Sequence, residues 1–211
     1  MLHGTNPSWT TYIPHGKREG QYPVRTCIWG SRDVKAGQLY VDSAEITAVV
    51  AHVGGRKLMV VSVYILDLSS STRTREENKE ELSSRLRTIE ELVQQEKLRD
   101  PQTKVIIAGD FNRHNPLWGG SCIDNTASQE DSAPIIDFMA ELSLRSLLPT
   151  GVITFVSDVG RSSTIDLMLT TLGLANLSLI LQARDISCHT TGCRKGQGGN
   201  RMAGELRGRV S

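Results

Sequence analysis

The apolar positions of this chain follow a strand period in some segments and a helix period in others. Residues 46–53 and 57–64 are rich in β-branched side chains and flank Gly54-Gly55, which predicts a β-hairpin. Residues 73–99 instead carry apolar side chains at intervals of four, three and four, at Leu82, Leu86, Ile89 and Val93. That spacing predicts one apolar helix face, with balanced charges on a solvated outer face and an end at Asp100-Pro101.

The second half of the chain continues this alternation. Residues 104–108 form an uninterrupted apolar run, which predicts a strand buried on both faces. A Gly/Asn/Ser-rich loop is expected over 112–130, and Asp131 or Ser132 is expected to cap a second helix with Pro134 in its first turn. Further strands are expected at 27–29, 152–156, 164–169 and 177–181, after an irregular start over 1–23. Strands alternating with helices predict an α/β layered domain with the helices outside.

Composition agrees with one globular domain and adds a charge asymmetry. The chain has 211 residues, 38% of them hydrophobic, and a formal net charge of +1. Residues 193–211 are Gly-rich and basic, which predicts a disordered tail behind a weakly acidic domain over 1–192. No apolar run is long enough to span a membrane. The four cysteines are scattered, so free thiols are favoured over a metal clip at Cys188 and Cys193.

The strongest candidate for chemistry is Gly109-Asp110-Phe111-Asn112, directly after the apolar strand. Loops at the carboxyl ends of strands commonly carry the sites of α/β sheets. Asp110 offers a proton acceptor, and Asn112 offers a donor and an acceptor without adding charge. Gly, Asp and Asn are also common turn formers, and for these four residues alone a turn is favoured.

The residues that follow shift this balance. They read Arg113-His114-Asn115-Pro116-Leu117-Trp118-Gly119-Gly120, in a chain with only three Trp. Trp118 could stack on a base or sugar. A packed loop anchor is an equally good interpretation of the same residue.

Together these motifs resemble the endonuclease/exonuclease/phosphatase superfamily. Within it, the chain is most similar to the apurinic-endonuclease-like domain of non-LTR (LINE-type) retrotransposons, especially fungal ones, from about Asn6 to Gly192. Three further stretches support the resemblance: Pro7-Ser8-Trp9 with Tyr12, the strand ending at Tyr64, and Ser163–Leu169 with Asp166 in its centre.

The resemblance implies a DNase I-like fold, a two-sheet β-sandwich flanked by helices, and DNA cleavage dependent on Mg²⁺ or Mn²⁺. It implies that Asp110 activates the attacking water, Asn112 holds that water or a phosphate oxygen, Tyr64 donates to the phosphate, and Asp166 orients a catalytic histidine. Tyr64 could instead be a core aromatic and Asp166 a turn residue. Residues on the substrate side would be Thr154, His114, Asn115 and Trp118.

Two departures from the family pattern qualify this expectation. Nothing before Tyr64 matches the family's Asn and Gln-Glu motifs, whose Glu is the principal metal ligand, so the metal ligands here are unknown. Cys193-Arg194-Lys195 stands where Ser-Asp-His would follow, and His189 is a poor substitute. We expect a domain truncated at both ends that lacks its first strands, with a reading-frame change near residue 192 as a hypothesis for the tail.

The sequence therefore supports two main hypotheses. The first is a retroelement-derived DNA endonuclease impaired by truncation, which would be intracellular, and nuclear if functional. Its full-length element would carry a reverse transcriptase, which is not present in this sequence. The second is an inactive fragment that binds nucleic acid weakly through its basic tail. A small-molecule or lipid phosphatase is disfavoured by the 113–120 loop.

Overall fold

The computed structural model describes residues 8–16, 24–67, 74–120, 126–157, 160 and 162–171, without the side chains of 126–128. The predicted strand at 177–181, the tail, His189, and Cys122, Cys188 and Cys193 lie outside these residues. Cys27, the cysteine that lies within them, is a free thiol.

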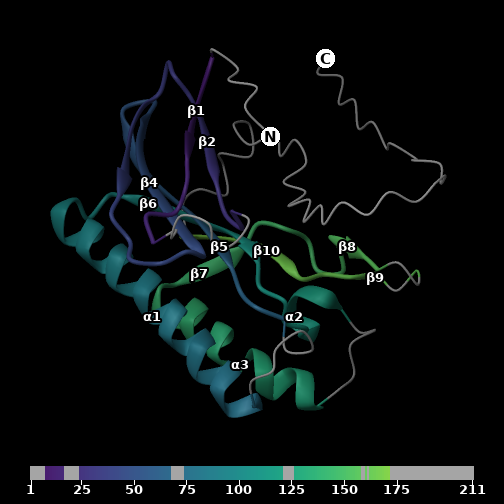
Figure 1. Ribbon diagram of the computed structural model, residues 1–211. Helices are drawn as coiled ribbons and strands as arrows, with labels where there is room; N and C mark the ends of the chain where they lie inside the picture. Colours follow the sequence, from purple (N-terminus) through teal and green to yellow (C-terminus); the bar gives the residue numbers. More distant parts are fainter. Residues whose placement is uncertain are drawn as a thin grey trace.

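The described residues form one large mixed sheet with helices packed against it (Figure 1). Its six strands run in the order β3-β4-β5-β6-β10-β7, and only β5 and β6 pair in parallel. Strands β1 and β2 make a separate antiparallel ribbon, and β8 and β9 a second short one. The strands are β1 (Trp9–Tyr12), β2 (Ile28–Ser31), β3 (Lys35–Leu39), β4 (Ile46–Val53), β5 (Arg56–Tyr64), β6 (Lys104–Asp110), β7 (Leu144–Ser146), β8 (Phe155–Val156), β9 (Ser162–Ser163) and β10 (Asp166–Thr171). The helices are α1 (Arg75–Arg99), α2 (Pro116–Gly119) and α3 (Thr126–Glu141).

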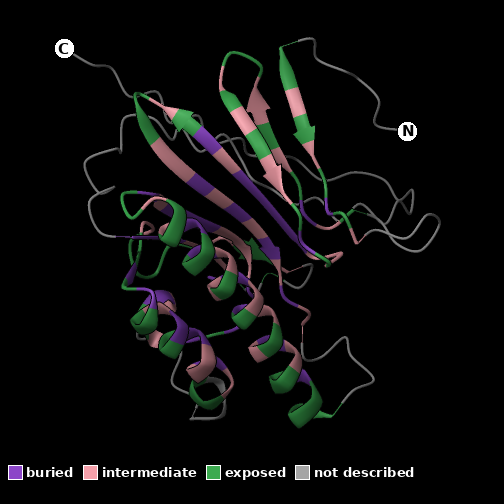
Figure 2. Cartoon of the chain, turned by 90° about the vertical axis from the view of Figure 1, so that its left-hand side faces the viewer, coloured by how far each residue is buried: buried purple, intermediate pink, exposed green. Residues whose placement is uncertain are grey.

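The core lies between one face of this sheet and helices α1 and α3. Alternate residues of β5 are buried on that face, and Figure 2 shows the resulting bands of buried and partly exposed positions along the strands. The core cluster contains Met59, Val61, Val63, Val105, Ile107, Leu167 and Leu169 from the sheet, and Leu82, Leu86, Ile89, Val93, Ile135 and Phe138 from the helices. This layered α/β arrangement confirms the predicted fold class.

Helix α1 confirms the period-based prediction in detail. Its apolar face is buried at the four predicted positions. Thr74 and Glu77 form a reciprocal capping box at the start, and Asp100 is the C-cap. Arg75 then joins α1 to α3 by ion pairs with Asp131 at 2.7 Å and Glu130 at 3.2 Å.

The predicted hairpin is also present, with β4 and β5 joined by Gly54 and Gly55. Both glycines have positive φ, 56° and 74°, as a tight turn between twisted strands requires. Strand β6 is buried at Val105, Ile106 and Ile107, as the continuous apolar run predicted.

Other boundaries were predicted wrongly. Helix α3 begins at Thr126, so the loop expected over 112–130 is shorter and contains α2, and Pro134 lies inside the helix instead of in its first turn. The irregular start over 1–23 contains β1, and the strand expected at 152–156 is only Phe155–Val156. Within the described residues, no helix is long and apolar enough to cross a membrane.

Candidate active site

Three of the predicted site residues form one row across the sheet. Tyr64 ends β5, Asp110 ends β6 and Asp166 begins β10, and the register pairs Asp110 with both Tyr64 and Asp166. Paired residues on neighbouring strands point to the same face. The row therefore lies on the face opposite the helices, because Val63 next to Tyr64 belongs to the helix-covered core.

Gly109 allows β5 and β6 to come together at this end of the sheet. Its φ is 156°, and a Cβ atom at this position would lie 1.8 Å from the Val63 carbonyl oxygen. No side chain fits in that space, so the glycine of the motif is required by a close backbone approach. Immediately afterwards, Phe111 is fully buried and its N–H donates to the Ile165 carbonyl at 2.9 Å, which fixes the chain against the start of β10.

Asn112 closes a turn around the carboxylate of Asp110. The Asn112 N–H donates to Asp110 Oδ1 at 2.9 Å, and its Nδ2 donates to the Ile65 carbonyl at 2.8 Å. Its φ of 47° lies in the left-handed region that Asn tolerates better than most residues. The motif therefore forms a turn, and that same turn holds the Asp110 carboxylate, so both interpretations of the sequence apply.

The carboxyl groups of Asp110 and Asp166 both hold protons more tightly than ordinary aspartates. Burial, together with the negative charge of Asp166, raises the pKa of Asp110 to about 7, against the hydrogen bonds from Asn112. Burial also raises the pKa of Asp166, and a hydrogen bond with the Thr154 side chain opposes this. Asp110 can therefore take up and release a proton near neutral pH.

Thr154 positions the strand that carries Asp166. Its Oγ1 accepts hydrogen bonds from the N–H groups of Ile165 at 3.1 Å and Asp166 at 3.0 Å. This residue was expected on the substrate side, which stays a prediction, and the structure shows that its side chain is hydrogen bonded to the start of β10.

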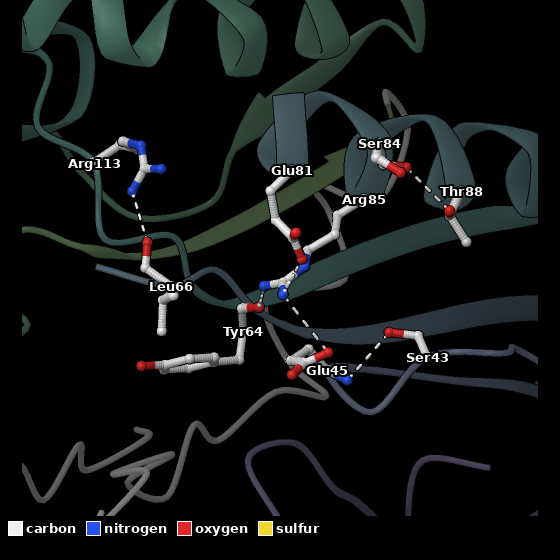
Figure 3. Close-up of polar contacts among 9 residues, drawn as sticks. All are labelled: Ser43, Glu45, Tyr64, Leu66, Glu81, Ser84, Arg85, Thr88 and Arg113. Atoms are coloured by element: carbon white, nitrogen blue, oxygen red, sulfur yellow. Dashed lines mark hydrogen bonds and ion pairs between the residues drawn. The ribbon is translucent and has the colours of Figure 1, made fainter. Parts of the chain in front are cut away.

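Tyr64 is held from two sides. Arg85 donates from Nη1 to the Tyr64 carbonyl at 2.9 Å and pairs with Glu81 and Glu45 (Figure 3). The Arg25 guanidinium lies over the Tyr64 ring, 4.8 Å from its centroid. Burial raises the pKa of Tyr64, and the positive charge of Arg25 partly opposes this.

The sequence that carries this site matches a known protein family. The family model described as endonuclease-reverse transcriptase matches residues 58–190, which contain Tyr64, Asp110 and Asp166. The chain belongs to the endonuclease-reverse transcriptase family. The predicted membership of the endonuclease/exonuclease/phosphatase superfamily, on its retrotransposon branch, is confirmed.

The chain is also similar to solved structures, and the first of the two matches below supports the fold. The endonuclease domain of TRAS1, a telomere-specific non-LTR retrotransposon, matches with a TM-score of 0.59 and 19% identity over 81% of this chain and 70% of that one. Truncated Caenorhabditis elegans TDP2 matches with a TM-score of 0.47 and 12% identity, over 78% of this chain and 62% of that one. No curated protein matches the sequence.

The 113–120 loop does not present its side chains together. His114 is exposed, whereas Asn115 caps α2 through the Leu117 N–H and donates to Ser132 Oγ at 2.8 Å. Trp118 is 3% exposed and its indole N–H donates to the Arg113 carbonyl at 3.0 Å. In this structure Trp118 is therefore a packed loop anchor, the second of its two interpretations.

Two charged residues near the row, Arg25 and Asp67, have no signal in the sequence pattern. Asp67 follows β5, and its charge raises the pKa of both Tyr64 and Asp110. Arg25 comes from a separate segment before β2, so only the folded chain brings it to Tyr64.

The side-chain oxygens of Asp110, Asn112 and Asp166 are of the type that Mg²⁺ prefers, because this ion binds carboxylate, amide and water oxygens. They do not make a complete site: the described residues contain no group of three His, Cys, Asp or Glu side chains that could hold a metal ion. Asp110 and Asp166 could supply at most two of the carboxylate ligands of such a site. The Asp166 side chain is hydrogen bonded to Thr154, and among the described residues no histidine takes that place.

Proposed function

We propose that this domain is a metal-dependent phosphodiester endonuclease that acts on DNA. One observation carries the proposal: the row of Tyr64, Asp110 and Asp166 joins a phenol, a carboxyl group with a pKa of about 7 and a second carboxyl group at one end of the sheet. Membership of the endonuclease-reverse transcriptase family supports nuclease chemistry. DNA as substrate is supported by the TRAS1 relationship, which is one of fold.

In the proposed reaction, Asp110 accepts a proton from a water molecule that attacks phosphorus. The new P–O bond forms as the bond to the leaving oxygen breaks, and that oxygen keeps the electron pair and takes a proton from solvent. Tyr64 donates a hydrogen bond to a non-bridging phosphate oxygen as negative charge develops there. Asn112 holds the Asp110 carboxylate in place through its N–H at 2.9 Å.

Mg²⁺ would lie on the side of Asp110 and Asp166, with Mn²⁺ as the alternative ion. A bound cation would neutralise negative charge on the phosphate and on the carboxylate pair. We expect slow turnover by this chain alone, because the described residues offer fewer than three metal-ligating side chains in one place.

The proposal is tested by nicking of supercoiled plasmid in Mg²⁺, with Asp110→Asn as the test variant and Asp137→Asn as its control. Asp137 is an exposed carboxylate on α3, the helix that packs on the face of the sheet opposite the row. We expect Asp110→Asn to lower the nicking rate at least about a hundredfold, because it removes the base. Asp137→Asn should retain the rate, and EDTA should abolish it.

Nicking that persists in Asp110→Asn or in EDTA would contradict the proposal. Absence of nicking by the unaltered chain, with retained DNA binding, would favour the second candidate, a non-catalytic nucleic-acid-binding module. The incomplete set of metal-ligating side chains is the observation that keeps this candidate open.

A further inference from the structure

The guanidinium of Arg25 lies over the side chain of Tyr64, a residue of the row. Its guanidinium carbon is 4.8 Å from the centroid of the Tyr64 ring, a distance typical of a cation–π contact. The two residues are far apart in sequence, and Arg25 lies in the segment before β2, outside the matched family segment 58–190. The contact therefore depends on how that segment is fixed to the sheet.

The neighbouring threonine fixes it. Thr26 is 2% exposed and its hydroxyl lies 3.0 Å from that of Thr47, a residue of β4 that is 1% exposed. The β4–β5 register places Thr47 opposite Ser62, two positions before Tyr64. Thr47 therefore shares the face of Ser62 and Tyr64, and the Thr26–Thr47 hydrogen bond holds Arg25 on the face that carries the row.

The charges near the row explain why a cation at this place matters. Asp110 and Asp166 belong to the row, the charge of Asp67 acts on Asp110, and a phosphodiester is itself an anion.

Stacking on a ring suits an arginine that binds phosphate. The contact uses the flat face of the guanidinium, and its N–H groups lie in the plane, where they can donate to two oxygens of one phosphate. A lysine could supply the charge but neither the planar stacking nor the paired donors. Burial raises the pKa of the Tyr64 phenol and the charge of Arg25 partly opposes this, so the phenol stays protonated and can donate a hydrogen bond at neutral pH.

We propose that Arg25 is a phosphate-binding and positioning residue of this site. It holds the Tyr64 phenol against the sheet end and donates to the phosphate that the phenol contacts. This inference rests on the proposed phosphodiesterase function, and it adds a contact from a segment outside the matched family region.

The first test measures DNA binding without turnover. Binding of a labelled duplex is followed by fluorescence anisotropy in EDTA over a series of salt concentrations, for the unaltered chain, Arg25→Ala, Arg25→Lys and Arg56→Ala. Arg56 is a matched control, because it is exposed at the opposite end of β5. We expect Arg25→Ala to weaken binding about tenfold and to reduce the salt slope by about one. Arg25→Lys should keep the slope and recover part of the affinity.

The second test reports on the ring contact. The tyrosinate absorbance is titrated in the unaltered chain and in Tyr64→Phe, and the difference isolates Tyr64. The same subtraction in the Arg25→Ala background should give a higher Tyr64 pKa, because a positive charge has been removed. Thermal unfolding of each variant shows whether it is folded.

The outcomes separate this inference from the proposed function. Equal affinity and salt slope for Arg25→Ala and Arg56→Ala, or no measurable DNA binding by the unaltered chain, would overturn the role of Arg25 in phosphate binding. An unchanged Tyr64 pKa would overturn its role in positioning. Loss of nicking in Asp110→Asn bears only on the proposed function, because neither test here requires cleavage.

Discussion

The two faces of the central sheet differ although the same strands build both. On the helix side, Met59, Val61 and Val63 of β5 are at most 1% exposed and pack against α1 and α3. On the other side, the alternate residues of β5 are partly exposed and end at Tyr64, beside Asp110. A step of one residue along the strand therefore changes the surroundings from a packed apolar core to a row of polar groups.

This division means that stability and chemistry are carried by different residues of one strand. The close-packed core on the helix side fixes the positions of the strand ends. The pairing of the strands then sets where the residues of the polar row lie relative to one another. Burial of Asp110 and Asp166 near each other is unfavourable when both are ionised, and the packed side offsets this cost. Substitutions on the two faces should therefore have distinct signatures.

The largest difference is expected between two neighbouring residues of β6. Ile107 is fully buried in the helix-side core, whereas Ile106 faces the other side and lies outside that cluster. Ile107→Ala should lower the free energy of unfolding by about 4 kcal/mol, and Ile106→Ala by about 2 kcal/mol, because the first leaves a cavity in a close-packed region. Urea denaturation measures both, and equal losses would show that the two faces are packed alike.

The next largest effect is a gain in stability at high pH on substitution of Asp110, a residue of the row. The pKa of Asp110 is raised from its ordinary 3.8 to about 7, so the folded state binds a proton more tightly than the unfolded state. The contribution of Asp110 to stability is therefore fully present below about pH 4, and it is lost as the pH rises towards 7. Allowing for partial exposure, the loss is of order 2 kcal/mol.

Asp110→Asn removes this titration. The variant should be more stable than the unaltered chain at pH 8 and nearly equal to it at pH 4, which urea denaturation at both pH values measures. Asp137→Asn serves again as the control, with no pH-dependent difference. A variant less stable than the unaltered chain at pH 8 would show that the Asp110 carboxylate stabilises the fold.

Elements with local signals were predictable from the sequence. The 4-3-4 spacing in α1 and the Gly54-Gly55 turn act within a few residues, so pattern alone located them. Strands β1, β3 and β7 were missed because they are three to five residues long and lack an apolar alternation. The start of α3 was missed because Asp131, Ser132 and Pro134 together read as a helix start, whereas the helix begins a turn and a half earlier.

The site divides in the same way. Motif resemblance identified Tyr64, Asp110, Asn112 and Asp166, and the register brings the first, second and fourth into one row. The resemblance could not distinguish residues whose side chains belong to the site from residues that pack in the core, because that distinction depends on burial in the folded chain. Trp118 and Asn115 belong to the same motif as Asp110, but their side chains are buried. Arg25 had no local signal, since the Thr26–Thr47 contact that places it is tertiary.

Thr154 offers the finest test of the comparison, because it affects the row without belonging to it. Thr154→Val keeps the shape of the side chain but removes the hydroxyl that accepts from the N–H groups of Ile165 and Asp166. We expect a loss of about 1–2 kcal/mol in the free energy of unfolding, because two partly buried donors lose their acceptor. Loss of the hydroxyl should also raise the pKa of Asp166 further, since the hydrogen bond with Thr154 lowers it.

Carboxyl ¹³C chemical shifts over a pH titration would measure this pKa change, and Thr88→Val is a suitable control. Thr88 lies on the exposed side of α1, where its hydroxyl donates to the Ser84 carbonyl at 3.0 Å. An unchanged Asp166 titration in Thr154→Val would mean that Thr154 supports only the backbone of β10. A raised Asp166 pKa would instead show that Thr154, a residue outside β5, β6 and β10, stabilises the ionised form of a carboxyl group of the row.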